Sequence, residues 1–181
     1  MGGIAPARLV FLDACGVLTS LARLHGRSLR GERARGAVPC GRWTRLGVLG
    51  ALGQEGMLAA MSVEAATSGA VFHACLERAL LPELRRSKPD AVLVMGNLGA
   101  RKTPKVRELL DRSGFPHRHL PSYSPDRSPI EPAWAQVKAE LRRVAARDED
   151  ALHQALGPAL DRVSAANAQA HFRRGGYKRP D

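Results

Sequence analysis

The sequence predicts a single α/β domain whose sheet contains both parallel and antiparallel strands. Two short apolar runs, Leu9–Leu12 and Ala91–Met95, carry no polar residue, which is typical of parallel strands buried on both faces. Two further apolar segments, Leu46–Leu52 and Met57–Ser62, flank Gly53–Gly56 and indicate an antiparallel hairpin. At 181 residues the chain is long enough for one domain with a real core and too short for two.

The first strand carries an acid and leads into a cationic segment. Leu9–Leu12 is expected to end on Asp13, so that this carboxylate lies at the carboxyl end of a buried strand. Between Arg23 and Arg45 there are seven arginines and one acid. Because four glycines and a proline interrupt this segment, we expect a loop without regular structure before the hairpin.

Helical spacing follows the hairpin. Ser68 is a candidate N-cap, and the apolar residues after it recur at spacings of three and four: Phe72, Cys75, Leu76, Ala79 and Leu80. After the second buried strand, Thr103 and Pro104 predict the start of another helix, and Gly114 is placed to end it. The segment His117–Leu120 is a short strand candidate.

The last third of the chain predicts three helices. One apolar stripe marks the first of them: Ile130, Trp134, Val137, Leu141 and Val144. Two more are expected at Glu149–Val163, with a bend at Gly157 and Pro158, and at Ala165–Phe172. The tail Arg173–Arg179 is basic and is expected to be mobile. This order of elements places the two buried apolar strands side by side as parallel neighbours.

The composition favours a polyanionic partner. Lys and Arg number 28 against 17 acidic residues, which gives a net charge of +11, and 23 of the 28 cations are Arg. Arginine grips phosphate with a planar fork, so nucleic acid is the partner that this charge favours. An Ala- and Arg-rich composition also arises without that function, and a cationic loop is also an ordinary solvated surface. The DNA-binding candidates are Arg27, Arg30, Arg33, Arg35, Arg42 and Lys102.

Cysteine usage and hydropathy argue against several classes of protein. The cysteines Cys15, Cys40 and Cys75 form no Cys-x-x-Cys pair, so the sequence indicates neither a disulfide framework nor a zinc cluster. The longest apolar runs are far shorter than the roughly 20 residues that cross a bilayer. The apolar start of the chain lacks a signal-peptide cleavage pattern. We expect a cytoplasmic protein with no membrane partner.

The segment Tyr123–Trp134 resembles a catalytic motif. It reads Tyr-Ser-Pro-Asp-Arg-Ser-Pro-Ile-Glu-Pro-Ala-Trp and is similar to the last catalytic motif of IS630-type transposases in the Tc1/mariner superfamily. It matches the usual form of that motif at all but Arg127 and Ser128. Three further segments resemble the first-acid strand, the second hairpin and the second-acid strand of this family: Val10–Asp13, Gly41–Gly53 and Val94–Leu98.

This resemblance implies a DDE catalytic domain with a ribonuclease H-like fold, in which a mixed central sheet is flanked by helices. Such domains cut and transfer the DNA strands of an insertion sequence with two Mg²⁺ or Mn²⁺ ions. By the resemblance, Asp13 and Glu131 are the first and third catalytic acids and bind the metal. We expect the domain to span residues 1–172 and the basic tail residues 173–181.

One position departs from the family. Gly96 stands where the second aspartate belongs, although the 34 residues between it and Glu131 are the family's own spacing. Mg²⁺ prefers oxygen ligands in near-octahedral geometry, so the loss of this ligand predicts weak metal binding and an impaired transposase. Asp90 lies at the other end of the same strand, about 20 Å away, and cannot replace it. Asp126 is the other candidate, an acid that the family carries beside its own triad.

The resemblance also sets expectations about partners. Family members carry an N-terminal helix-turn-helix region that recognises the ends of the element, whereas this chain starts almost directly at the first catalytic strand. A separate helix-turn-helix polypeptide is then expected to supply end recognition. Because transposases usually act as dimers on paired DNA ends, a homodimer is expected as well.

Several alternatives stay open at this point. The chain could be a non-catalytic DNA-binding remnant that keeps the fold and the basic surface. Phe11–Leu18 also resembles the nucleophile motif of haloacid-dehalogenase-like hydrolases, although Val94–Leu98 does not provide the downstream acidic pair which that family needs. Glu131 has two structural interpretations: it forms a capping box with Ser128, or it lies just outside a helix that begins at Pro132.

Overall fold

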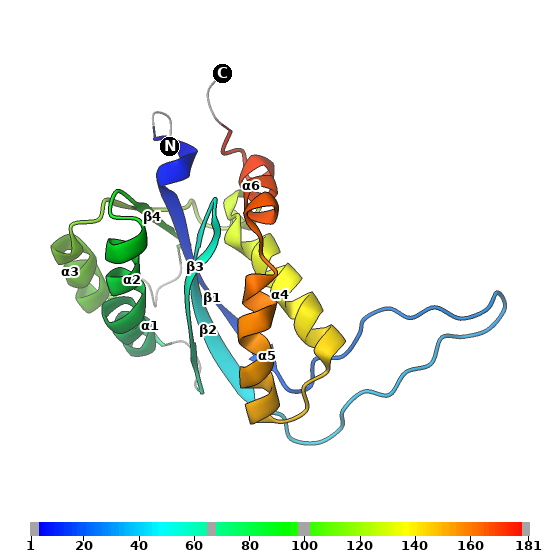
Figure 1. Ribbon diagram of the computed structural model, residues 1–181. Coiled ribbons are helices and arrows are strands. Elements are labelled where there is room, and N and C mark those ends of the chain that lie inside the picture. Colours follow the sequence, from blue (N-terminus) through cyan, green and yellow to red (C-terminus); the bar gives the residue numbers. More distant parts are fainter. Residues whose placement is uncertain (1–3, 65–67, 98–101, 179–181) are drawn as a thin grey trace.

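A five-stranded mixed sheet separates two helical layers (Figure 1). The computed structural model describes residues 4–64, 68–97 and 102–178, so Leu98 and Arg179 of the predicted segments lie outside the described residues. The strands follow the order β3-β2-β1-β4-β5 across the sheet. Their bounds are β1 Leu9–Leu18, β2 Arg45–Gly53, β3 Gly56–Val63, β4 Val92–Met95 and β5 His117–His119.

Helices α1, α2 and α3 cover one face of the sheet, and α4, α5 and α6 cover the other (Figure 1). A π-helical segment at Leu76–Leu80 joins α1 to α2, and single 3-10 turns lie at Pro6–Arg8 and Pro125–Arg127. No helix in the described part of the chain is long and apolar enough to cross a membrane. The helices are α1 Gly69–Cys75, α2 Leu81–Ser87, α3 Pro104–Ser113, α4 Ile130–Val144, α5 Glu149–Asp161 and α6 Ala165–Arg174.

The pairing of the strands confirms the predicted topology. β1 pairs in parallel with β4, from Leu9 opposite Val92 to Leu12 opposite Met95. β2 pairs with β1 and β3 in antiparallel fashion, so the predicted hairpin is present, and β5 continues the parallel half of the sheet. The sheet is therefore antiparallel on one side of β1 and parallel on the other.

β1 is longer than the sequence predicted. It was expected to end on Asp13, but it continues to Leu18. The extra residues pair with the hairpin strand β2, ending with Leu18 opposite Arg45. This half of β1 is only partly buried, and Asp13 separates its residues Ala14–Leu18 from the buried run before it, so the two halves do not stand out as one strand in the sequence. Asp13 thus lies inside β1, although it is still next to the carboxyl end of the shorter strand β4.

Alternate residues of β1 contribute to two separate cores. Phe11 packs with Val94, Trp134 and Phe172 under α4, α5 and α6. Val10 and Leu12 pack with the residues of α1, α2 and α3 on the opposite face. Because successive side chains of a strand point to opposite faces, both sides of the sheet are apolar in its centre. This explains why the two central strands show uninterrupted apolar runs.

Local signals set the helix ends on the α1 to α3 face as predicted. Ser68 Oγ accepts a hydrogen bond from the Val71 amide, and Thr103 Oγ1 accepts one from the Val106 amide. Gly114 ends α3 in the left-handed conformation, with φ of 80°. The helix that begins after Ser68 widens into the π-helical segment just before Pro82. A proline ring crowds the carbonyl four residues earlier, and the wider turn relieves that contact.

The prediction of a mobile tail is wrong for Arg173–Tyr177. Helix α6 continues to Arg174. The Tyr177 ring then packs on Phe11 and Phe172, with ring centroids 5.0 and 6.0 Å away. Its hydroxyl donates a hydrogen bond to the Arg127 carbonyl at 2.8 Å. These contacts fix the chain after α6 against the turn that precedes α4.

Candidate active site

Asp13 lies beside the position that follows β4. The last parallel pair joins Leu12 to Met95, so the next residues on the two strands, Asp13 and Gly96, are neighbours at a strand spacing of about 4.8 Å. On its other side Asp13 is paired with Gly50 of β2. The Asp13 side chain is 7% exposed. The sheet therefore brings the first and second positions of the predicted triad together.

Both positions face the layer formed by α4. Phe11 and Val94, each two residues earlier on its strand, belong to the core beneath that helix. Side chains two residues apart on a strand share a face, so Asp13 points toward α4, and a side chain at position 96 would do the same if the alternation of β4 continued one residue past Met95. Gly96 supplies no side chain there. Its carbonyl oxygen lies 3.4 Å from Nδ1 of His119.

Glu131 occupies the first turn of α4 and is exposed. Neither sequence interpretation of its position is correct. The helix begins at Ile130 with Pro129 as N-cap, and the Ser128 side chain makes no capping bond, so there is no capping box. Pro132 is the third helical residue, where its missing N–H is harmless because the first N–H groups of a helix have no intrahelical partner. Glu131 is thus held by the helix itself.

The buried ring of Trp134 seats α4 on the sheet. Trp134 is 2% exposed. A methyl group added at Gly50 would lie 2.7 Å from the Trp134 ring, so this glycine makes room for the ring beside Asp13. The predicted apolar stripe is confirmed for Ile130, Trp134, Val137 and Leu141, which are buried, whereas Val144 is 47% exposed. The stripe turns the first turn of α4, with Glu131, toward the end of β4.

The electrostatic surroundings of Cys15 place both acids at one site. The pKa of the Cys15 thiol is raised to about 12, chiefly by burial; the charge of Lys138 lowers it, and the charges of Asp13 and Glu131 raise it. Cys15 lies two residues after Asp13 on the same face of β1. All three charges thus act on one point of the sheet. Asp13 of β1 and Glu131 of α4 are therefore both near enough to Cys15 for their charges to act on its thiol.

Lys138 and Cys15 are site neighbours that the sequence analysis missed. Lys138 follows Glu131 by seven residues, which is close to two turns of a helix and puts both on one side of α4. Cys15 follows Asp13 by two residues, which is the repeat of a strand. With Asp13 and Glu131 as candidates, the two-residue strand spacing predicts Cys15 as a neighbour of the site, and the seven-residue helix spacing predicts Lys138.

The nearby acids do not replace the missing one. Asp90 precedes β4, at the end opposite Gly96, and forms an ion pair with Arg8 at 3.5 Å. Asp126 is exposed in the 3-10 turn at Pro125–Arg127, and its charge raises the pKa of Tyr177. Asp90 is therefore too far along the strand, as predicted, and Asp126 lies near the tail ring.

The arginine candidates lie on a long loop between β1 and β2. This loop projects away from the body of the molecule (Figure 1) and is exposed along most of its length, with Leu24, Leu29, Val38 and Trp43 all more than half exposed. The five loop candidates are themselves exposed: Arg27, Arg30, Arg33, Arg35 and Arg42. The loop carries its cations into solvent rather than folding them onto the sheet.

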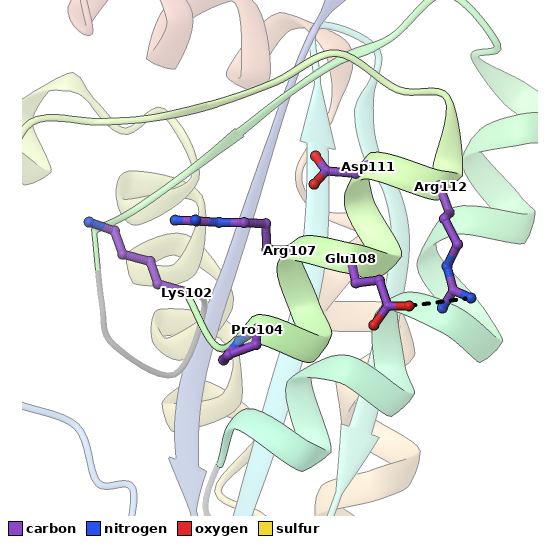
Figure 2. A pocket seen from close by; sticks show the side chains of 6 residues that line it. All are labelled: Lys102, Pro104, Arg107, Glu108, Asp111 and Arg112. Atoms are coloured by element: carbon purple, nitrogen blue, oxygen red, sulfur yellow. Dashed lines mark ion pairs between the residues drawn. The ribbon is translucent and has the colours of Figure 1, made fainter.

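Lys102 lies apart from that loop, at a shallow hollow along α3. The hollow has a volume of about 370 Å³ and is lined by Lys102, Pro104, Arg107, Glu108, Asp111 and Arg112. Figure 2 shows Lys102 and Arg107 extending to the same side, while Glu108 pairs with Arg112 at 3.7 Å. Cations and acids alternate along this helix, so the hollow is not uniformly basic.

The side chains at the candidate site fit a hard divalent cation, with one gap. Asp13 and Glu131 are oxygen donors on one face, which is the donor type that Mg²⁺ and Mn²⁺ prefer. A site for two such ions needs carboxylates that bridge or flank both of them. Position 96 faces the same side as Asp13 and contributes none. The residues present therefore suit one weakly held ion better than two.

A methyl group at Gly50 is expected to destabilise the protein. Gly50→Ala forces contacts of 2.6 Å with Cε of Met57 and 2.7 Å with the Trp134 ring, and such overpacking costs about 1–3 kcal/mol. Gly157→Ala is the matched control, because no described atom lies within 4 Å of a methyl group there and alanine favours the helix. Thermal unfolding should show a lower midpoint for Gly50→Ala only. Equal midpoints would contradict the close packing of α4 on β2.

The fold is similar to that of a transposase catalytic domain. The Mos1 mariner paired end complex with Mn matches with a TM-score of 0.75 at 15% identity, over 93% of this chain and 52% of that chain. The Mos1 strand transfer complex gives 0.73 at 15% identity, over 93% and 51%. The catalytic domain of Mos1 gives 0.65 at 15% identity, over 94% and 80%. The chain spans about half the length of the Mos1 chains in the two complexes.

These likenesses identify the fold as ribonuclease H-like, with a mixed sheet flanked by helices, which confirms the predicted fold class. No curated protein matches the chain. A family model described as DDE superfamily endonuclease matches residues 8–153. That range holds β1 with Asp13, the end of β4 and α4 with Glu131. Because the match covers most of the chain, the protein belongs to the DDE superfamily of endonucleases.

Proposed function

We propose that the chain is the catalytic domain of an IS630-type transposase that cuts and transfers the DNA strands of an insertion sequence, impaired at Gly96. The observation that carries this proposal is the convergence of Asp13, position 96 and Glu131 on one face, beside the end of β4. The membership in the DDE superfamily and the motif at Tyr123–Trp134 support it. The Mos1 structures, which include a paired end complex and a strand transfer complex, support the same class of reaction.

Mg²⁺ or Mn²⁺ is the cofactor in this proposal, and Asp13 and Glu131 are the residues that would hold it. Mos1 structures with Mn and with Mg support this choice. When bound, such ions stabilise the attacking and leaving oxygens of a phosphodiester displacement. In this chain Asp13 is held rigidly inside β1, and Glu131 is held on the first turn of α4. Because Gly96 offers no ligand atom, Asp13 and Glu131 would hold such an ion more weakly than three acids would.

DNA is the proposed partner, and the projecting loop between β1 and β2 is its proposed contact. The loop carries Arg27, Arg30, Arg33, Arg35 and Arg42 in an exposed segment, and Lys102 adds a cation at the start of α3. Phosphate contacts of this kind give affinity without sequence specificity. Recognition of transposon ends by a separate helix-turn-helix polypeptide, assembly of a homodimer on those ends and activity in the cytoplasm are further parts of the proposal.

Loss of loop arginines is expected to weaken DNA binding and its salt dependence. Each phosphate contact contributes about 0.9 to the slope of log K against log salt concentration. The triple variant Arg27→Ala, Arg30→Ala and Arg33→Ala should therefore lower that slope by up to about 2.7. The matched control removes the same charge from the α1 to α3 face, through Arg78→Ala, Arg85→Ala and Arg112→Ala. Fluorescence anisotropy with duplex DNA measures the affinity and the salt slope of both triple variants. An equal decrease in the slope for the two variants would contradict the role of the loop.

A non-catalytic DNA-binding protein is the second candidate, and Gly96 is the observation that favours it. Incubation of supercoiled plasmid with Mg²⁺ or Mn²⁺ separates the two candidates. If Gly96→Asp gains nicking activity, the chain is a disabled transposase domain. If neither chain nicks the plasmid while both bind it, the DNA-binding remnant is favoured. The haloacid-dehalogenase-like alternative gains no support from the fold or from the family match.

A further inference from the structure

A second group of metal-ligating side chains lies away from Asp13 and Glu131. Glu64 directly follows the edge strand β3, and Glu149 and His153 lie on the first turns of α5. One ligand atom from each of the three residues lies within 4.8 Å of the other two. The group therefore joins two elements that are distant in sequence.

The imidazole of His153 is oriented toward the two carboxylates. Its Nδ1 lies 3.3 Å from the hydroxyl of Ser62 on β3, at hydrogen-bond distance. Its Nε2 faces Glu64, with 4.0 Å between Nε2 and Oε1. A histidine that binds metal through one ring nitrogen is usually held in place by a hydrogen bond at its other ring nitrogen. Glu149 precedes His153 by four residues, the spacing that places two ligands on one side of a helix.

The two carboxyl groups lie close together at the start of α5. One oxygen of Glu64 and one oxygen of Glu149 lie within 4.8 Å of each other and of a ring nitrogen of His153. An ordinary helix start does not require this arrangement, because Asp148 already caps α5 by accepting a hydrogen bond from the Ala151 amide. A divalent cation between the two carboxylates would remove their mutual repulsion.

We propose that Glu64, Glu149 and His153 form a binding site for a divalent transition-metal cation of the Zn²⁺ type, with water in the remaining position. One imidazole nitrogen and two carboxylate oxygens suit Zn²⁺, whereas Mg²⁺ and Ca²⁺ prefer oxygen ligands alone. Bonds from ligand atoms to Zn²⁺ are about 2.0–2.2 Å long. The three ligand atoms must therefore move closer to one another to bind a single ion. The side chains of Glu64 and His153 are 70% and 36% exposed, which leaves them room to move.

This site is separate from the candidate active site. Ala60 of β3 is opposite Gly50, which is itself opposite Asp13. Glu64 lies four residues farther along, about 13 Å away in the strand direction and two strands across the sheet. A cation here would tie the edge strand β3 to α5, so it acts on stability rather than on DNA cleavage.

Thermal unfolding of the whole chain with and without ZnCl₂ tests the proposal. A ligand that binds only the native state at a hundredfold excess over its Kd raises the midpoint of a protein of this size by about 5–10 °C. We expect this rise with Zn²⁺, whereas any rise with Mg²⁺, which Asp13 and Glu131 would hold, should be unaffected by His153→Gln. His153→Gln and Glu149→Gln should each abolish the rise while leaving the midpoint without metal nearly unchanged. The control His117→Gln, at a histidine that pairs with Asp111 at 3.8 Å and is not one of the three proposed ligands, should keep the rise with Zn²⁺.

Two further measurements distinguish Zn²⁺ binding at this site from binding at other residues of the chain. The double variant Asp13→Asn and Glu131→Gln should keep the response to Zn²⁺ in full, whatever its effect on DNA cleavage. Co²⁺ bound to the chain should show no thiolate charge-transfer band, because the proposed ligands exclude Cys15, Cys40 and Cys75. The proposal is overturned if Zn²⁺ gives no rise, if His153→Gln keeps the rise, or if the double variant loses it.

Discussion

Gly96→Asp is expected to raise the rate of plasmid nicking in Mn²⁺ by about a hundredfold or more. The new carboxylate lies beside Asp13, on the face toward α4, where the family resemblance places its second acid. Removal of one preorganised group that stabilises a transition state typically costs a factor of about 10² to 10³ in rate, and we expect restoration of the missing metal ligand to be of the same order. Conversion of supercoiled to open-circular plasmid measures the effect, and it does not depend on recognition of transposon ends.

Position 97 provides the matched control for this gain. Asn97→Asp adds the same charge one residue farther along, at a side chain that contacts the segment after β5. Asn97 donates a hydrogen bond to the Ser122 hydroxyl at 2.6 Å, which holds it on its own side. We expect no nicking from Asn97→Asp, and none from Gly96→Asp combined with Asp13→Asn. Activity in either would mean that the carboxylates are not arranged as described.

Trp134→Ala is expected to cost about 3–5 kcal/mol of stability, the largest loss from a single substitution that we predict. The ring is buried in the core between β1, β2 and α4 and has Gly50 beneath it. A natural domain of ordinary stability unfolds at about 5–15 kcal/mol, so this change removes a large share of the total. Urea unfolding followed by circular dichroism measures the loss.

Trp134→Phe separates the ring volume from the indole N–H. The Trp134 Nε1 is buried and has no hydrogen-bond partner among the residues that the structure describes, and an unpaired buried donor costs about 1–3 kcal/mol. Phenylalanine removes that donor and keeps most of the contact area, so its loss should be clearly smaller than that of alanine. If alanine and phenylalanine are equally tolerated, α4 is not held on the sheet by this ring.

Much of the fold could be predicted because its signals are local. The apolar runs at β1 and β4, the Gly-bounded hairpin and the caps at Ser68 and Thr103 each need only a few neighbouring residues to be recognised. The parallel pairing of β1 with β4 followed from their burial on both faces. This pairing also fixes where Asp13 and Gly96 meet, so the core of the candidate site could be predicted from the order of elements.

The remaining errors come from contacts between distant segments. β1 extends beyond Asp13 because β2 pairs with it up to Leu18, and nothing in the residues after Asp13 indicates that partner. Tyr177 is fixed by Phe11 and Phe172, which a local count of basic residues does not reveal. The start of α4 was missed because two competing local signals were present, and Pro129 took the N-cap position instead of Ser128.

Lys138 and the group around His153 were missed for a related reason. Lys138 becomes meaningful only when β1 and α4 are placed together, since its charge acts on Cys15 from another element. Glu64 and His153 are 89 positions apart in the sequence and meet only because α5 packs beside β3. Pairs of this kind carry no spacing that marks them in a single sequence.

Calorimetric titration of Mn²⁺ tests most directly whether Asp13, position 96 and Glu131 form one metal site. It is made in a His153→Gln background, so that the other group of ligands does not contribute. We predict that Gly96→Asp binds Mn²⁺ at least about tenfold more tightly than Gly96, and that Asp13→Asn or Glu131→Gln abolishes this gain. Equal affinities, or a gain that survives both substitutions, would contradict the arrangement of the site described above.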